Sequence, residues 1–360
     1  HIPAAAAVDQ MVRCARTSGA SRAAGFVNGV LRHLVRELDS IAPPSLEADP
    51  LSHLVHALSL PEWIAARWLR RFGAEGAAAL AEACNGRPPT TLRVNCQRGS
   101  RGDLVDALRV RFPAVAPCAV ASTGLTLGKP LHPGQETSFR EGLFSIQDEA
   151  SQAVIDLLDP KPGEHILDTC AAPGTKANAI AERVGPDGSV VATDRHERRL
   201  SLVGRESRRL GLSNLRAHCL DASVELGQLR ADHPEAFDRV LVDAPCSGLG
   251  TLRRNPDARW RVRPDDPERL AESQRKLLDQ ALQWVRPGGA LVYSVCTFEP
   301  EECEDVVAAF LAAHDNVSLA ARSALLETLV PWLDETGYLR SFPHRGGGDG
   351  FFAARFEVAS

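Results

Sequence analysis

The spacing of hydrophobic positions changes twice along the chain and divides the sequence into three regions. In the first, apolar residues recur at roughly helical spacing, which predicts helices over 4–16 and 23–37 before a break at Pro43-Pro44. In the second, short helices alternate with isolated strands. In the third, strands alternate regularly with helices, as in a parallel α/β sheet. The pattern predicts domains over 1–58, 59–140 and 141–360.

The middle region has the pattern of a small α+β module. Ser59 is placed to cap a helix whose first turn contains Pro61 and Glu62. This helix is expected to end at Arg71. The elements expected after it are a helix over 75–84, a strand over 91–95, a helix over 103–110 and a short strand over 125–127.

The pattern of the third region predicts a parallel sheet. Because parallel strands run in the same direction, the loops that follow them lie together at the edge of the sheet formed by the carboxyl ends of the strands. The expected strands are 165–170, 189–194, 215–220, 239–243, 290–296 and 351–357. The expected helices between them are 176–184, 195–210, 266–285 and 300–312. The glycine run 346–348 predicts a flexible loop before the last strand.

The segment HILDTCAAPGTK, residues 165–176, has the form of a strand, a loop of small residues and a helix. Small residues let the backbone approach a ligand, and a helix N-terminus favours negative groups. A nucleotide that carries a carboxylate, such as S-adenosylmethionine, fits this segment. The glycines of a dinucleotide fingerprint are absent, which argues against an NAD-linked dehydrogenase. Carboxylates at or just after successive strand ends also predict a ligand crevice: Asp168, Asp194, Asp221 and Asp243.

Two cysteines are expected at the same edge of the sheet. Cys246 lies in the segment DAPCSG that follows one strand, and Cys296 ends the next in YSVCT. Methylation of cytosine at carbon 5 needs a thiolate that adds to carbon 6, because carbon 5 alone is a poor nucleophile. It also needs an acid near ring nitrogen 3 to stabilise the developing charge. Either cysteine can supply the thiolate, and the residues alone do not choose between them.

These segments resemble, in order and spacing, the Sun (Fmu) family of RNA cytosine-5 methyltransferases, and its bacterial 16S ribosomal RNA members most of all. The resemblance covers 141–360 and includes 168–176, 243–248, 293–297 with 299–304, and DGFF at 349–352. The segment 144–151 is similar to the family's entry into the catalytic domain, and 246–261 to its stretch with an Arg-Arg-x-Pro-Asp core. Residues 25–32 are similar to a helix of a NusB-like RNA-binding domain.

The resemblance implies an α/β fold. It consists of a Rossmann-like S-adenosylmethionine methyltransferase domain with a mostly parallel seven-stranded sheet, preceded by a small α+β module and an all-α NusB-like domain. It implies that Cys296 is the nucleophile, that Cys246 assists product release and that Asp243 contacts the cytosine. The residues it assigns to the cofactor S-adenosylmethionine are Cys170, Ala171, Ala172, Pro173, Gly174, Thr175, Lys176, Asp194, Asp221 and Asp243.

Three positions depart from the family pattern. Thr175 stands where the family usually has glycine, Val295 where it usually has threonine, and Cys303 where it often has asparagine. We expect these changes to alter affinity without abolishing activity. Thr175 is the critical one, because a β-branched residue is poorly suited to a backbone position with positive φ.

Composition limits the partners. The net charge of −5 does not decide whether the chain binds nucleic acid, because the distribution of charge matters more than its sum. The aromatic content of 5% argues against a stacking platform for RNA. RNA contact is therefore expected from clustered arginines beside the active site, with the target base extruded into the crevice. The arginines that we expect to clamp phosphate are Arg253, Arg254, Arg259 and Arg261.

The nine cysteines form no CxxC pair and no zinc-spaced Cys/His cluster, which predicts reduced thiols, a cytoplasmic location and no metal. No apolar run has the length of a membrane span. We expect a monomer. The start at His1, within an amphipathic stretch, suggests that the natural N-terminus lies upstream. Two alternatives stay open: a methyltransferase of the same chemistry that acts on tRNA, and a catalytically silent RNA-binding or ribosome-assembly factor.

Overall fold

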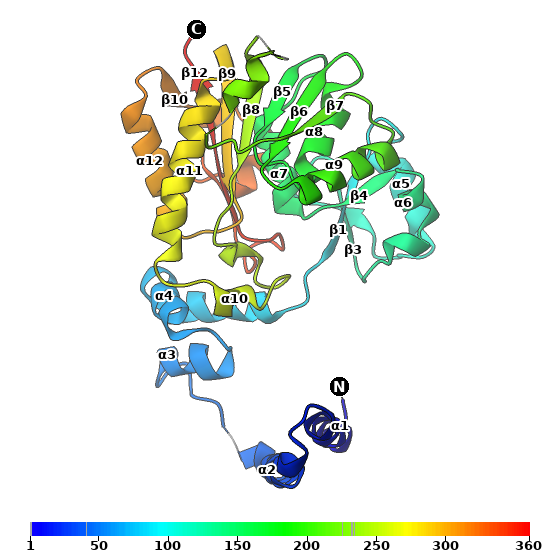
Figure 1. Ribbon diagram of the computed structural model, residues 1–360, viewed down its shortest axis with the longest axis vertical. Coiled ribbons are helices and arrows are strands. Elements are labelled where there is room, and N and C mark those ends of the chain that lie inside the picture. The colour runs from blue at the N-terminus through cyan, green and yellow to red at the C-terminus, as the bar shows by residue number, and fades with distance from the viewer. Residues whose placement is uncertain (1, 41, 225, 232, 234) are drawn as a thin grey trace. The chain divides into compact units, whose positions relative to one another are not determined.

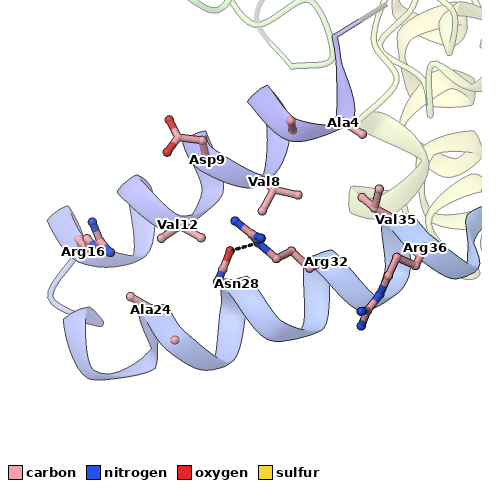
Figure 2. A pocket seen from close by; sticks show the side chains of 12 residues that line it. Ala4, Val8, Asp9, Val12, Arg16, Ala24, Asn28, Arg32, Val35 and Arg36 are labelled. Atoms are coloured by element: carbon pink, nitrogen blue, oxygen red, sulfur yellow. Dashed lines mark hydrogen bonds between the residues drawn. The ribbon is translucent and has the colours of Figure 1, made fainter.

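The computed structural model describes all residues except 1, 41, 225, 232 and 234, so the expectation about His1 lies outside the described residues. The chain forms two compact units, residues 1–75 and 76–360. In the first unit, α1 (Ala4–Thr17) and α2 (Ala24–Glu37) lie side by side, as the helical spacing predicted. A hollow of about 620 Å³ between them is lined by Val8, Val12 and Arg16 on α1 and by Arg32 on α2 (Figure 2).

The helix predicted after Ser59 is α4 (Glu62–Asn85), which begins three residues later. Ser59 itself has a left-handed backbone conformation, with φ of 57°, and its role as the cap stays a prediction. The two helices expected here form one assigned element with a break at Gly73, where φ is 70° and ψ is 177°. Shorter elements precede and follow α2: η1 (Ser21–Ala23), η2 (Leu38–Ser40), α3 (Pro50–Ser52) and the π-helical turn η3 (His53–Ala57).

The second unit begins with a small antiparallel sheet in the order β2-β3-β1-β4. Its strands are β1 (Thr90–Val94), β2 (Ala116–Pro117), β3 (Gly124–Leu127) and β4 (Phe144–Ile146). One face packs on α5 (Arg101–Arg109), which starts at a capping box formed by Ser100 and Asp103. Two short helical turns, η4 (Pro133–Gln135) and α6 (Thr137–Arg140), complete this α+β module.

The remaining chain builds an eight-stranded sheet. Seven of its strands follow the order β10-β12-β9-β8-β5-β6-β7 (Figure 1). The eighth strand, β11, pairs with β12. The strands from β9 through β7 are mutually parallel, and the pairs that involve β12 are antiparallel. The strands are β5 (His165–Asp168), β6 (Ser189–Asp194), β7 (Leu215–Cys219), β8 (Phe237–Asp243), β9 (Val285–Val295), β10 (Val317–Leu319), β11 (Leu339–Ser341) and β12 (Phe351–Val358). The helices are α7 (Glu149–Leu158), α8 (Thr175–Val184), α9 (Glu197–Leu210), α10 (Ala258–Arg261), α11 (Asp266–Leu282) and α12 (Glu304–Ala313). Turns of 3-10 helix lie between them: η5 (Leu226–Ala231), η6 (Leu249–Thr251), η7 (Pro300–Glu302), η8 (Arg322–Ala324) and η9 (Glu327–Trp332).

Both faces of the central strands β5, β6 and β9 are largely buried, which explains why these strands are rich in apolar residues, whereas no residue of the edge strand β7 is buried. Successive residues of one strand point to opposite faces, so Ile166 and Leu167 belong to different cores. One core contains α7, α8 and α9. The other contains α11 and α12, yellow and orange in Figure 1.

The order of the strands fixes where a ligand can bind. The chain leaves β5 toward β6 and β7, and then returns to add β8 and β9 on the other side of β5. The loops after β5 and β8 therefore diverge, and the carboxyl ends of strands at such a point are where open α/β sheets form their ligand crevice. The predicted cofactor segment and both predicted cysteine segments follow strands that end at this edge.

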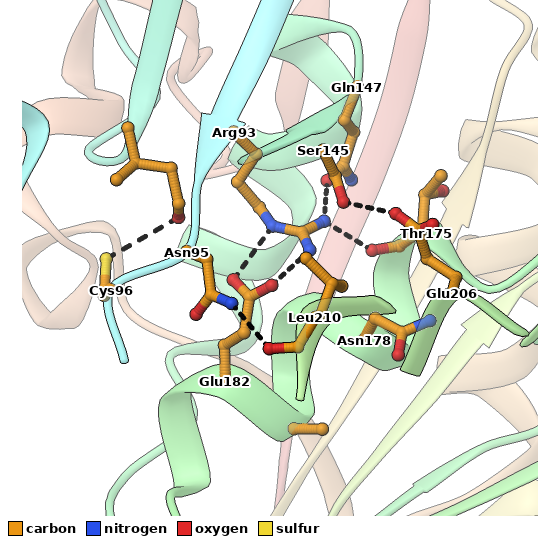
Figure 3. Close-up of polar contacts among 12 residues, drawn as sticks. Arg93, Asn95, Cys96, Ser145, Gln147, Thr175, Asn178, Glu182, Glu206 and Leu210 are labelled. Carbon is orange, nitrogen blue, oxygen red and sulfur yellow. Dashed lines mark hydrogen bonds and ion pairs between the residues drawn. The ribbon is translucent and has the colours of Figure 1, made fainter. Parts of the chain in front are cut away.

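The α+β module is joined to the large sheet through the polar face of β1 (Figure 3). The Arg93 side chain is only 3% exposed, and its Nε and Nη2 donate to the Glu182 carboxylate over 3.2 and 2.7 Å. Nη1 donates to Gln147 Oε1 over 2.5 Å and to the Thr175 carbonyl, at the start of α8, over 2.7 Å. Asn95, two residues along the same face, donates to the carbonyls of Gly142 and Leu210. The module thus contacts the first residue of the helix that follows the cofactor loop.

Replacement of this arginine should be costly. Arg93→Met leaves the Glu182 carboxylate buried without its counter-charge, so we expect the free energy of unfolding to fall by about 3–5 kcal/mol. Arg109→Met is the matched control, because the Arg109–Asp106 pair is 65% and 78% exposed, and its loss should cost less than about 1 kcal/mol. Urea denaturation of both variants tests the difference. Equal losses would contradict a structural role for the buried pair.

Candidate active site

The loop that follows β5 is held in one conformation by contacts with β6, α8 and α9. The Ala172 amide donates to Asp194 Oδ2 over 3.2 Å, and its carbonyl accepts from Arg199 Nη2 over 2.6 Å. Gly174 has φ of 108°, and a Cβ there would lie 2.9 Å from the Val203 Cα. These contacts make a turn that only glycine fits, directly before α8.

The concern about Thr175 is resolved by this geometry. Thr175 is the first residue of α8, whereas the positive φ belongs to Gly174. Among the described residues other than glycine, only Ser59 and Asp159 have positive φ. A β-branched side chain is therefore compatible with the backbone at Thr175.

The four predicted carboxylates lie at or just after the carboxyl ends of the neighbouring strands β8, β5, β6 and β7, but they have different surroundings. Asp194 also accepts from the His196 amide over 2.8 Å, and Asp221 accepts from the Ser223 amide and hydroxyl. The Ser223 hydroxyl lowers the pKa of Asp221, so this carboxylate is a ready acceptor for ligand hydroxyl or amino groups. Asp168 is fully buried, and its Oδ2 has no hydrogen-bond partner among the described residues.

Both carboxylate oxygens of Asp243 accept hydrogen bonds from neighbouring side chains. Its Oδ2 accepts from Lys176 Nζ over 2.7 Å, and its Oδ1 accepts from the Ser294 hydroxyl over 2.7 Å. Asp243 and Ser294 are register partners on β8 and β9, so the parallel pairing itself brings them together. Lys176 is 7% exposed and lies in the predicted cofactor segment. The ion pair thus connects the cofactor end of the crevice to the end where the cysteines lie.

The two predicted cysteines meet. The Sγ atoms of Cys246 and Cys296 are 3.3 Å apart, and both side chains are partly exposed. Their following neighbours are also joined, because the Ser247 hydroxyl donates to Thr297 Oγ1 over 3.0 Å. The hydrogen bond with Cys296, together with burial, raises the pKa of the Cys246 thiol well above its usual range. Cys246 is therefore held as a thiol that can donate to the sulfur of Cys296.

A pair of glycines brings the C-terminal segment against both cysteine loops. The Gly250 amide donates to the Cys296 carbonyl over 3.0 Å, and the Gly250 carbonyl accepts from the Gly350 amide over 2.8 Å. A Cβ at Gly250 would lie 2.0 Å from the Gly350 carbonyl oxygen. A Cβ at Gly350, the glycine of the DGFF segment, would lie 2.8 Å from the Gly250 Cα, so the close approach requires glycine at both positions.

Three family models match the chain. One, 16S rRNA methyltransferase RsmB/F, matches residues 155–357; an RsmF/B-like ferredoxin-like domain matches 60–132, and the NusB family matches 1–36. The probable ribosomal RNA small subunit methyltransferase B of Bacillus subtilis is 39% identical over 355 residues, which cover 98% of this chain and 77% of that protein. The chain belongs to the RsmB/F family of 16S rRNA methyltransferases.

Solved structures agree with this membership. A methyltransferase homologue from Pyrococcus horikoshii is 30% identical, with a TM-score of 0.72 over 86% of this chain and 98% of that one. NSun6 from the same organism, solved with SFG, shares the fold at 21% identity, with a TM-score of 0.73 over 85% of this chain and 100% of that one. The predicted family and fold class are thereby confirmed, whereas the three domain boundaries stay a prediction.

The arginines expected to clamp phosphate are mostly engaged within the RsmB/F fold. Arg253 and Arg254 donate through Nε to the two oxygens of Asp349, over 2.7 and 2.5 Å, and Arg254 also donates to Asp148 over 2.8 Å. The Arg253 side chain is only 5% exposed. Arg259 is buried and donates to Asn85 Oδ1. Arg261 is 70% exposed beside Asp257 and stays the best-placed candidate of the four.

Several residues of this site were not predicted. Ser294 could have been found from the strand register, because it lies opposite Asp243 in the parallel pair. Asp148 and Arg93 gave no such signal, since their partners lie far away in the sequence.

None of the described helices combines the length and hydrophobicity that a membrane span requires. Within the described part of the chain, no cluster of three or more His, Cys, Asp or Glu residues could hold a metal ion.

Asp168 should make the stability of the RsmB/F fold depend on pH. Burial, and then the charge of Asp243, raise the pKa of Asp168 to about 8. The unfolded value is ~3.9, so the stabilisation is fully present below that pH and is lost as the pH rises through about 8.

The substitution Asp168→Asn removes this dependence. The free energy of unfolding of the wild type should fall relative to that of the variant across this pH window, as measured by urea denaturation without cofactor. The same substitution at exposed Asp315 is the control. A constant difference between wild type and Asp168→Asn across the window would contradict the raised pKa.

Proposed function

We propose that this chain transfers a methyl group from S-adenosylmethionine to carbon 5 of a cytosine in 16S rRNA through a covalent cysteine–cytosine intermediate. The observation that carries the proposal is the pair of thiols 3.3 Å apart at the crevice that also contains Asp243. A scaffold without catalytic activity has no use for two such thiols. The names of the relatives favour ribosomal RNA over tRNA. Action in the cytoplasm as a monomer is part of the same proposal.

The residues present fit S-adenosylmethionine. Asp194 and Asp221 offer carboxylates at successive strand ends, the loop over 170–174 offers small residues, and the buried Asp168 oxygen lacks a partner among the described residues. When bound, S-adenosylmethionine supplies an electrophilic methyl group on its sulfonium. We assign its binding to the predicted set of residues, with Lys176 held by Asp243 rather than free for the cofactor.

In the proposed reaction, the Cys296 thiolate forms a bond to carbon 6 of the cytosine, and the electrons of the carbon 5–carbon 6 double bond move to carbon 5 and the ring. Asp243 contacts the ring at nitrogen 3. Lys176, 2.7 Å from that carboxylate, adds a positive charge where negative charge develops. Carbon 5 then forms a bond to the methyl group, and the bond between that methyl group and the sulfonium breaks, with its electron pair left on the sulfur.

Product release needs a proton to leave carbon 5 and the bond from carbon 6 to sulfur to break. Cys246 gives its proton to the departing sulfur of Cys296 and takes the carbon 5 proton in its place. The electron pair of the carbon 5–hydrogen bond restores the double bond, and the electrons of the carbon–sulfur bond return to sulfur. Its raised pKa and the 3.3 Å separation suit Cys246 to this exchange.

The two cysteines should fail in different ways. With tritium-labelled S-adenosylmethionine and unmethylated 16S rRNA, Cys296→Ala should transfer no methyl group, because no covalent bond can form. Cys246→Ala should accumulate a protein–RNA adduct that survives denaturing electrophoresis, because release is blocked. Cys96→Ala, at an exposed cysteine, is the control and should behave as wild type. Full transfer by Cys296→Ala would refute the covalent mechanism, and cofactor binding without any transfer by wild type would favour a silent factor or another RNA.

RNA affinity should depend on salt through Arg261. Each phosphate contact contributes about −0.7 to −0.9 to the slope of log affinity against log salt, so Arg261→Gln should reduce that slope by about 1. Arg286→Gln is the control: Arg286 is 48% exposed near the start of β9, at the opposite edge of the sheet. Filter binding over a range of monovalent salt measures both. A wild-type affinity that does not change with salt would rule out the arginine contact.

A further inference from the structure

A closed ring of buried polar groups contacts the segment that contains Cys246. Gln274 on α11 donates through Nε2 to Glu302 Oε1 over 3.0 Å and accepts at Oε1 from the Tyr293 hydroxyl over 2.9 Å. The Tyr293 hydroxyl also lies 2.6 Å from the Glu302 backbone carbonyl. All three side chains are completely buried. The ring thus joins α11, β9 and the turn η7 that follows Cys296.

Two side chains of this ring form hydrogen bonds with the backbone on both sides of Cys246. The amide of Ser247, the residue after Cys246, donates to Glu302 Oε1 over 2.8 Å. The carbonyl of Pro245, the residue before it, accepts from Gln274 Nε2 over 2.9 Å. The backbone on either side of Cys246 is therefore held by these two side chains, and a shift of this segment relative to Cys296 would break one of the two hydrogen bonds.

Glu302 is the costly member of the ring. Burial raises the pKa of its carboxyl group, and its Oε2 has no hydrogen-bond partner among the described residues. A buried carboxyl with a partnerless oxygen destabilises a fold relative to an apolar side chain of similar volume. The hydrogen bond that Glu302 accepts from the peptide group between Cys246 and Ser247 therefore accounts for a carboxyl group at this buried position.

We propose that Glu302 is a positioning residue for Cys246, which holds the Cys246 thiol in contact with Cys296 for the release step. The inference rests on the proposed function. Capture of the cytosine needs Cys296, and methyl transfer needs the cofactor loop, neither of which Glu302 contacts in the described hydrogen bonds. Loss of Glu302 should therefore slow release and leave the earlier steps unchanged, as loss of Cys246 does.

The test compares Glu302→Gln and Glu302→Ala in the full chain. A hydrogen bond to a charged acceptor is worth a rate factor of about tenfold or more. We expect multiple-turnover methylation to fall by about that factor in Glu302→Gln and further in Glu302→Ala, while the single-turnover methyl-transfer rate stays within about twofold of wild type. The covalent protein–RNA adduct should increase in the order wild type, Glu302→Gln, Glu302→Ala, Cys246→Ala.

Glu304→Gln is the matched control, because Glu304 lies two residues away and pairs with Arg340 over 3.2 Å. It should leave adduct level and turnover unchanged. A fall of single-turnover transfer, cofactor affinity and melting temperature together in Glu302→Gln would show a merely structural role and overturn the inference. If Cys246→Ala traps the adduct and Glu302→Gln does not, the inference fails and the proposed function stands. If Cys246→Ala traps none, the proposed function fails first.

Discussion

The buried guanidinium of Arg93 is the interaction on which the cofactor half of the crevice depends. A guanidinium taken out of water is stable only when its donors are satisfied. Here the Glu182 carboxylate, the Gln147 amide and the Thr175 carbonyl accept from all three of its nitrogens. One of these partners begins α8, directly after the loop fixed by Gly174. The small module before the catalytic domain is thus part of the scaffold of the site.

Much of the catalytic domain could be predicted from the sequence, because strands buried on both faces leave a strong apolar signal. The strand predicted over 189–194 is β6 itself, and most other predicted ends lie within two residues of those observed. The largest difference is the start of β9, predicted at 290 and observed at Val285. The strands missed are short, such as β10 and β11, and depend on pairing with β12 rather than on their own pattern. Helix α7 was missed because all of its residues are buried, polar ones included, so it shows no polar face.

The site was harder to predict wherever a side chain acts through a distant partner. Strand ends alone brought Asp243, Cys246 and Cys296 to one edge, since parallel order requires it. The sequence pattern could not show that Arg253 and Arg254 pair with Asp349 and Asp148. An arginine that pairs with a carboxylate distant in the sequence has the same local pattern as an arginine exposed to solvent.

The two halves of the crevice are held by different buried ionisable groups, and this separation has a chemical consequence. Arg93 fixes the start of α8 from outside the catalytic domain, whereas Glu302 fixes the Cys246 loop from within it. The Lys176–Asp243 pair is the direct connection between the halves, and it lies where the cytosine ring is proposed to bind. In the proposed reaction, the cytosine contacts both halves at that pair. The residues proposed for methyl donation and those proposed for product release are thus positioned by separate interactions, although they act on the same base.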